Sequence, residues 1–207
     1  METVWHRIDA WLARHAPRYR ERLRPPAQPD RIAEAERHLG VPLPADLARW
    51  WSCADGFRRT PPAPQPLGHL LPDCFDPYSV AEALGERAMH LRVSREIVPP
   101  DLVERWQTWQ ERCRRDPAAA LYPGEASVLW IPEWLPIAGD GAGGGLFVDL
   151  RSGPHRGCVV RFNDTGHEAT PEWTDSEAML THVANALESL PMDTGGATVI
   201  GAWRVPG

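Results

Sequence analysis

Residues 134–150, which read WLPIAGDGAGGGLFVDL, are the stretch that decides the fold. Two apolar runs, 134–138 and 146–150, flank a segment of glycine and aspartate. Glycine adopts positive φ at little steric cost and aspartate tolerates it, so the pattern predicts a strand, a tight turn and a second strand. The glycines also resemble G-x-G-x-x-G, but a phosphate-binding loop must open a helix, and LFVDL is typical of a strand. We therefore predict a hairpin.

The β pattern continues on both sides of this hairpin. Short β-prone runs occupy 128–131 and 158–162, and residues typical of turns separate them from the hairpin. A final helix is predicted to begin at Asp175 as its N-cap and to run through Leu190, because apolar residues recur there every four positions.

The first half of the chain has the periodicity of helices. Apolar residues at i, i+4, i+7 and i+8 predict a helix over 2–16. A second helix is expected to start at Asp30 as N-cap and to end before Gly40. Further predicted elements share weaker signals: a helix from Pro44 to before Asp55-Gly56, a proline-rich loop over 60–68 that could instead be a polyproline II ligand, a short strand at 70–71, and helices over 80–91 and 100–115.

This order of elements predicts the fold class. Helices come first, a meander of strands follows and a helix closes the chain, which is typical of an α+β protein. We expect a mixed or antiparallel sheet packed by the N-terminal and C-terminal helices. The length and apolar content suit one domain over 1–190 with a helical insertion at 91–128, followed by a tail over 191–207 in which 197–203 could add a strand.

Composition excludes several function classes. The formal net charge is −6, which disfavours nonspecific nucleic-acid binding and favours a basic partner. All 22 basic residues are arginine. Without lysine there is no Schiff-base, P-loop or kinase-type lysine.

The cysteines and the hydropathy bear on location. Four cysteines lie far apart, which matches neither a zinc knuckle nor a thioredoxin-like redox site. The sequence does not begin with a secretory pattern, and no apolar run approaches the roughly 20 residues that span a bilayer. We therefore expect a cytoplasmic protein with reduced thiols and no membrane partner.

No arrangement of residues in the sequence predicts catalysis. Eight histidines are scattered, and neither H-E-x-x-H nor G-x-S-x-G occurs. Asp140 is expected to stabilise its turn, and Asp149 to lie on the solvent face of its strand. The prediction is a protein without a catalytic site, a metal or a cofactor; a hydrolase that uses scattered carboxylates is a remaining alternative.

Two blocks of short motifs, in a fixed order, resemble the SMI1/KNR4 family of the SUKH superfamily. The first block is Pro25-Pro26-Ala27, Ile32, Glu36, Leu39-Gly40, Leu43-Pro44, Leu47, Trp50 through Asp55-Gly56, and Leu70-Leu71-Pro72. The second is Trp134 to Ala138, Asp140-Gly141, Gly144, Phe147 to Leu150, Gly157 to Val160, and the last helix. Asp55-Gly56 departs from the Asn-Gly of many members, and 91–128 and the tail have no counterpart in the family pattern.

The resemblance implies an α+β domain that acts by binding another protein. Bacterial members are widely interpreted as immunity proteins that neutralise polymorphic toxins, often nucleases, and fungal relatives are linked to cell-wall synthesis and signalling. The leading hypothesis is thus an immunity protein with a toxin domain as its partner, and the alternative is a regulatory or scaffolding protein with an endogenous partner. The candidate contact residues, each with a structural role as the alternative, are Trp50, Trp51, Asp55, Asp140 and Asp149.

Overall fold

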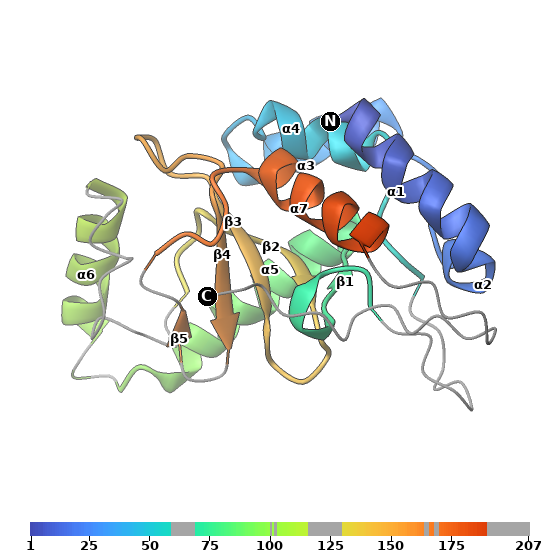
Figure 1. The fold of residues 1–207 in the computed structure, drawn as a ribbon. Helices are drawn as coiled ribbons and strands as arrows, with labels where there is room; N and C mark the ends of the chain where they lie inside the picture. Colours follow the sequence, from blue (N-terminus) through green and yellow to red (C-terminus); the bar gives the residue numbers. More distant parts are fainter. Residues whose placement is uncertain are drawn as a thin grey trace.

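A computed structural model describes residues 1–58, 69–99, 101, 103–115, 130–163, 166–167 and 170–189. Its elements, in chain order, are α1 (Glu2–His15), α2 (Pro17–Arg20), α3 (Pro29–Leu39), α4 (Ala45–Trp51), η1 (Pro72–Cys74), β1 (Asp76–Pro77), α5 (Val80–Ile97), α6 (Val103–Arg115), β2 (Trp134–Gly139), β3 (Gly145–Asp149), β4 (Val159–Asn163), β5 (Gly166–His167) and α7 (Ser176–Ser189). The fold is α+β, as predicted (Figure 1).

The sheet is an antiparallel meander. Its five strands lie in the order β1-β2-β3-β4-β5, so each strand pairs with its neighbour in sequence. The predicted hairpin is confirmed as β2 and β3, with Trp134 opposite Asp149 and Gly139 opposite Gly145. The register shifts between Pro136 and Ala138, where a proline cannot donate to the ladder. The strand expected at 128–131 is wrong for its described part, because Trp130 and Ile131 lead into a turn.

The predicted helices are present, with several changes at their ends. Gly40 ends α3 at φ 73°, as expected, but Gln28 rather than Asp30 is its N-cap. Asp175 accepts a hydrogen bond from the Ala178 amide at 2.7 Å and caps α7, as predicted. Helix α5 continues to Ile97, into the segment interpreted as an insertion.

The short strand expected at 70–71 is wrong. Leu71 instead forms an isolated bridge with Phe75 across the turn of η1. The proline-rich loop and the C-terminal strand lie outside the described residues, and the boundary of the single domain stays a prediction.

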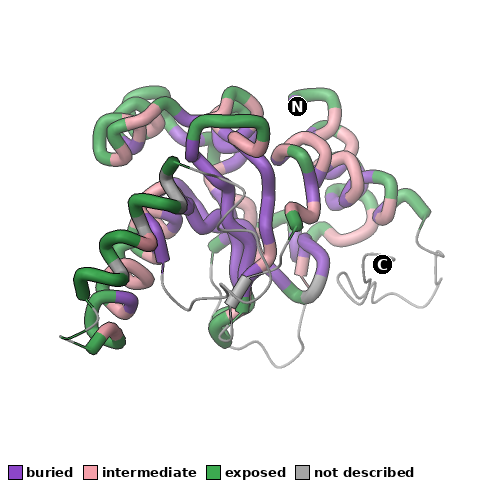
Figure 2. Tube along the Cα trace, turned by 90° about the vertical axis from the view of Figure 1, so that its left-hand side faces the viewer, coloured by how far each residue is buried: buried purple, intermediate pink, exposed green. Residues whose placement is uncertain are grey.

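The central strands are buried on both faces. Figure 1 shows α1, α3, α4 and α7 gathered over one side of the sheet, with α5 behind it. Alternate side chains such as Leu146 and Val148 join the main hydrophobic core, to which α1, α3, α4 and α7 also contribute. Phe147 and Val160 face the other way, into a second cluster with Trp130 and Trp134. Figure 2 accordingly shows the strands as almost entirely buried chain.

This double coverage corrects one prediction. Asp149 does not lie on a solvent face, since its relative exposure is 0%. Its carboxylate instead forms an ion pair with the equally buried guanidinium of Arg151. None of the described helices has both the length and the apolar character needed to cross a membrane.

Candidate partner-binding cleft

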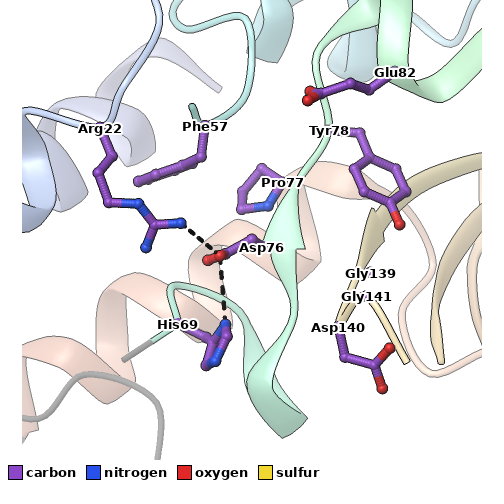
Figure 3. A pocket seen from close by; sticks show the side chains of 10 residues that line it. All are labelled: Arg22, Phe57, His69, Asp76, Pro77, Tyr78, Glu82, Gly139, Asp140 and Gly141. Atoms are coloured by element: carbon purple, nitrogen blue, oxygen red, sulfur yellow. Dashed lines mark hydrogen bonds and ion pairs between the residues drawn. The ribbon is translucent and has the colours of Figure 1, made fainter. Parts of the chain in front are cut away.

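A cleft of about 200 Å³ opens beside β1 at the edge of the sheet (Figure 3). It is lined by Arg22, Phe57, His69, Asp76, Pro77, Tyr78, Glu82, Gly139, Asp140 and Gly141. These residues come from the segments after α2 and after α4, the segment before η1, β1 and its link to α5, the first turn of α5, and the end of β2 with the turn that follows it. We call this hollow the β1 cleft.

The carboxylate of Asp76 lies between Arg22 and His69 in the β1 cleft (Figure 3). It accepts hydrogen bonds from the Tyr19 hydroxyl at 2.7 Å and from Arg22 Nη2 at 2.8 Å. His69 Nδ1 lies 3.5 Å from Oδ2, which is close enough for an electrostatic contact but longer than the usual hydrogen bond of about 2.7–3.2 Å. Burial opposes ionisation of Asp76, but the contacts with His69, Tyr19 and Arg22 outweigh it and lower the pKa of this carboxyl. Asp76 is therefore a fixed anion at neutral pH.

The Arg22 side of the cleft is held by stacking and backbone bonds. The guanidinium of Arg22 lies 5.0 Å from the ring centroid of Tyr19 and 5.7 Å from that of Phe57. Leu23 bridges to Phe57, whose amide donates to the Pro77 carbonyl at 3.1 Å. The segment after α2 is thereby fastened to the edge of the sheet, which places Arg22 over Asp76.

The opposite wall belongs to the first turn of α5. Ser79 and Glu82 form a capping box, in which each side chain accepts the backbone amide of the other. The other oxygen of Glu82, Oε1, accepts a hydrogen bond from Arg24 Nη2 at 3.1 Å. Close packing fixes the neighbouring Tyr78, because a Cβ built on Gly139 would lie 1.9 Å from the Tyr78 hydroxyl. Only glycine fits at position 139 without displacing that ring.

Asp140 lies at the mouth of the cleft, on the β2–β3 turn. Its Oδ1 accepts hydrogen bonds from the amides of Ala142, at 2.7 Å, and Gly144, at 3.0 Å. This confirms that Asp140 stabilises its own turn, in which Gly141 takes a φ of +76°. Asp140 is exposed, and Figure 3 shows its carboxylate turned from the cleft interior toward the turn.

Two further hollows share the Arg24–Glu82 ion pair with the β1 cleft. A groove of about 650 Å³ lies between α1 and the end of α4, and one of about 320 Å³ lies between α3 and α5. Arg24 lines both grooves, and its partner Glu82 lines the β1 cleft. The three hollows thus meet at the Arg24–Glu82 pair, and we call their combined surface the concave face.

Among the candidate contact residues, only Asp140 is exposed. Trp50 and Trp51 are each 1% exposed, and Trp51 Nε1 donates to the Tyr78 carbonyl at 3.1 Å. Half-buried Asp55 accepts from the Val80 amide at 2.8 Å, at the start of α5. Both tryptophans are packed in the core and Asp149 is in a buried ion pair, so the structure does not bring the five candidates together as one surface.

Sequence reasoning missed Arg22, His69, Asp76 and Glu82. The S-x-x-E pattern of 79–82 is a readable capping signal that could have drawn attention to Glu82. Arginines at positions 20, 22 and 24 alternate, and their partners are Asp9, Asp76 and Glu82. Because the last two partners are more than fifty residues away, local sequence does not predict these pairs.

The described residues contain no cluster of three or more histidine, cysteine, aspartate or glutamate side chains that could hold a metal ion.

The model of the SMI1/KNR4 family (SUKH-1) matches residues 26–185, a range that includes every residue of the β1 cleft except Arg22. The chain is also 25% identical over 199 residues to a glucan synthesis regulatory protein of Neurospora crassa. That match covers 85% of this chain but 37% of the fungal protein, so the chain spans little more than a third of that relative's length.

Proposed function

The chain belongs to the SMI1/KNR4 family (SUKH-1), and we propose that it is a non-catalytic protein-binding module that serves as a cytoplasmic immunity protein against a toxin. The partner in this proposal is a toxin domain, with a nuclease as the leading class. Membership of this family supports the proposal, because a protein-binding role is what the resemblance implies. A formal net charge of −6 also suits a basic toxin, because long-range attraction raises the rate of encounter.

The observation that carries the proposal is the concave face. At its centre the Arg24 and Glu82 side chains are 36% and 23% exposed, so a partner can reach both. Each is already held by neighbours, since Arg24 Nε donates to the Phe57 carbonyl and Glu82 completes the capping box. Binding would therefore cost little side-chain entropy, and arginine is a residue type enriched among interface hot spots.

Co-expression with toxins provides the test. Toxin-like reading frames beside the gene are expressed singly in a sensitive host, with and without this protein. We expect the protein to restore growth against one of them and to co-purify with it. If none of these toxins is neutralised or bound, the immunity role is wrong.

A pair of variants then tests the surface. Arg24→Gln is expected to weaken binding to the toxin by about tenfold or more. Arg92→Gln is the matched control, because Arg92 lies on the exposed side of α5 with a side chain that is 69% exposed. Equal binding by both variants would place the contact surface elsewhere.

A regulatory protein is the second candidate, which the match to the glucan synthesis regulatory protein favours. In that case the partner is an endogenous protein of cell-wall synthesis. Deletion of the gene should then alter cell-wall polysaccharide content in the absence of any toxin, and a plasmid copy should restore it. An unchanged wall would count against this candidate.

A further inference from the structure

We propose that residues 25–31 form a polyproline II ligand that inserts into an aromatic-lined groove of the protein partner, with a carboxylate of the partner facing Arg31. The segment reads PPAQPDR and has the order P-x-x-P-x-R from Pro26 to Arg31. The inference rests on the proposed protein-binding function. It specifies which segment of this chain the partner binds and the chemistry of the surface that binds it.

The backbone of this segment has the polyproline II conformation. Gln28 has φ −68° and ψ 144°, close to the values of about −75° and +145° that define this helix. Prolines at positions 25, 26 and 29 hold φ at about −65°, and a residue that precedes a proline is disfavoured from the α-helical region. No helix or strand includes residues 24–28, and α3 begins only at Pro29.

Burial along the segment has the period of this helix. A polyproline II helix has three residues per turn, so positions 24 and 27 share one edge. Arg24 is half-buried and Ala27 is buried, whereas positions 25, 26, 28 and 29 are all exposed. One edge therefore lies against the protein, and the edges formed by 25 with 28 and by 26 with 29 face solvent. A groove that binds a polyproline II helix needs two open edges, which this fold provides.

Backbone hydrogen bonds hold the segment in place. Three of them join it to the end of α4 and the residues that follow: the Arg24 amide to the Gly56 carbonyl at 3.0 Å, the Ala27 amide to the Trp51 carbonyl at 2.8 Å, and the Asp55 amide to the Pro25 carbonyl at 3.2 Å. A partner would therefore bind a segment that is already ordered, and little conformational entropy would be lost. The Pro26 carbonyl accepts no hydrogen bond from the described residues, so it can accept one from the partner.

Arg31 supplies the charged end of the ligand. It follows Pro29 by two positions, and its side chain is 70% exposed. Its ion pair with Glu34 joins two exposed side chains at 3.7 Å, so it contributes little and can exchange for a carboxylate of the partner. The segment also borders the concave face, because Pro25 and Pro26 line the groove between α1 and α4.

Binding of an isolated SH3 domain tests the inference, because such domains recognise polyproline II segments through an aromatic-lined groove. The probe is an SH3 domain that selects the order P-x-x-P-x-R, and isothermal titration calorimetry measures its affinity for the full chain. We expect saturable binding. Pro26→Ala, Pro29→Ala and Arg31→Gln should each weaken it by about tenfold.

Pro17→Ala is the matched control for these variants. Pro17 is exposed and begins α2, as Pro29 begins α3, so this change tests the loss of a proline at a helix start outside the segment. Thermal melts check that every variant is folded. No binding by the unaltered chain, or binding by the three segment variants as tight as by Pro17→Ala, would overturn the inference.

The outcome for the proposed function is separate. If a toxin is neutralised and binds Pro26→Ala and Arg31→Gln as tightly as the unaltered chain, the segment is not its binding site, so the inference fails and the immunity role stands. If no toxin is neutralised but the SH3 domain binds with the expected dependence on Pro26, Pro29 and Arg31, the immunity role fails and the ligand segment stands.

Discussion

Asp149 and Arg151 form a buried ion pair at the end of β3, with both side chains 1% exposed. Arg151 Nε lies 2.9 Å from Oδ1 and 3.0 Å from Oδ2 of the carboxylate, and its guanidinium carbon lies 5.8 Å from the ring centroid of Trp134. The Arg151 amide also donates to Oδ1 at 3.0 Å. The pair therefore lies beside the aromatic cluster that contains Trp134, at the point where the chain leaves β3.

Removal of one partner of this ion pair should lower the stability of the fold. Asp149→Ala leaves a buried guanidinium without its counter-charge, and we expect the free energy of unfolding to fall by about 3–5 kcal/mol. Urea denaturation measures the change. Replacing both partners, as in Asp149→Leu with Arg151→Met, should recover most of the loss. A double variant as unstable as Asp149→Ala would show that the pair is not the cause.

His90 should make stability depend on pH. Its ring stacks on Trp130 with centroids 4.3 Å apart, and burial lowers its pKa from 6.5 to about 4. Between these values the unfolded chain binds a proton that the folded chain does not, so stability falls as pH decreases from 6.5 to about 4. We expect a loss on the order of 2 kcal/mol, since part of the ring reaches solvent. Denaturation curves across this pH range measure it.

The control for this prediction replaces the titrating ring. His90→Phe keeps an aromatic ring against Trp130 and Phe162 but has no proton to bind. The decrease in stability between pH 6.5 and pH 4 should be correspondingly smaller in this variant. The same slope in both proteins would assign the pH dependence to other groups.

Two glycine-to-alanine substitutions should have opposite effects. At Gly139 a Cβ would meet the Tyr78 hydroxyl at 1.9 Å, so Gly139→Ala must displace that ring and should cost about 1–3 kcal/mol. At Gly85, in α5, a Cβ meets nothing within 4 Å, so Gly85→Ala should stabilise the protein by about 0.5–1 kcal/mol. Thermal unfolding compares the two. Destabilisation by both would contradict the packing described at these positions.

Asp55 allows a candidate contact residue to be tested against its structural role. Its Oδ1 accepts the Val80 amide at 2.8 Å, a donor in the first turn of α5 that has no partner within its own helix. Asp55→Ala should therefore lower stability by about 1 kcal/mol, and Asp55→Asn, which keeps an acceptor, should lower it less. If Asp55→Ala instead weakens partner binding without a change in the unfolding curve, Asp55 is a contact residue.

Local sequence was sufficient where the structure depends on neighbouring residues. The hairpin of 134–150, the helix end at Gly40 and the cap at Asp175 were all predicted, because each follows from backbone preferences or side-chain bonds over a few positions. The turn role of Asp140 belongs to the same class, since both of its donors lie within four residues.

Only the tertiary structure decided which surfaces are covered and which residues share the cleft. Alternation along β3 predicts one buried face, but it does not show that helix α5 and an aromatic cluster bury the other face. The sequence alone therefore predicts, wrongly, that Asp149 faces solvent. The cleft depends on contacts such as Tyr19 with Asp76, 57 residues apart, which form when the segment after α2 packs on the edge of the sheet. The physical reason is that periodicity records the preferences of one segment, while burial and pairing are set by the segments that pack against it.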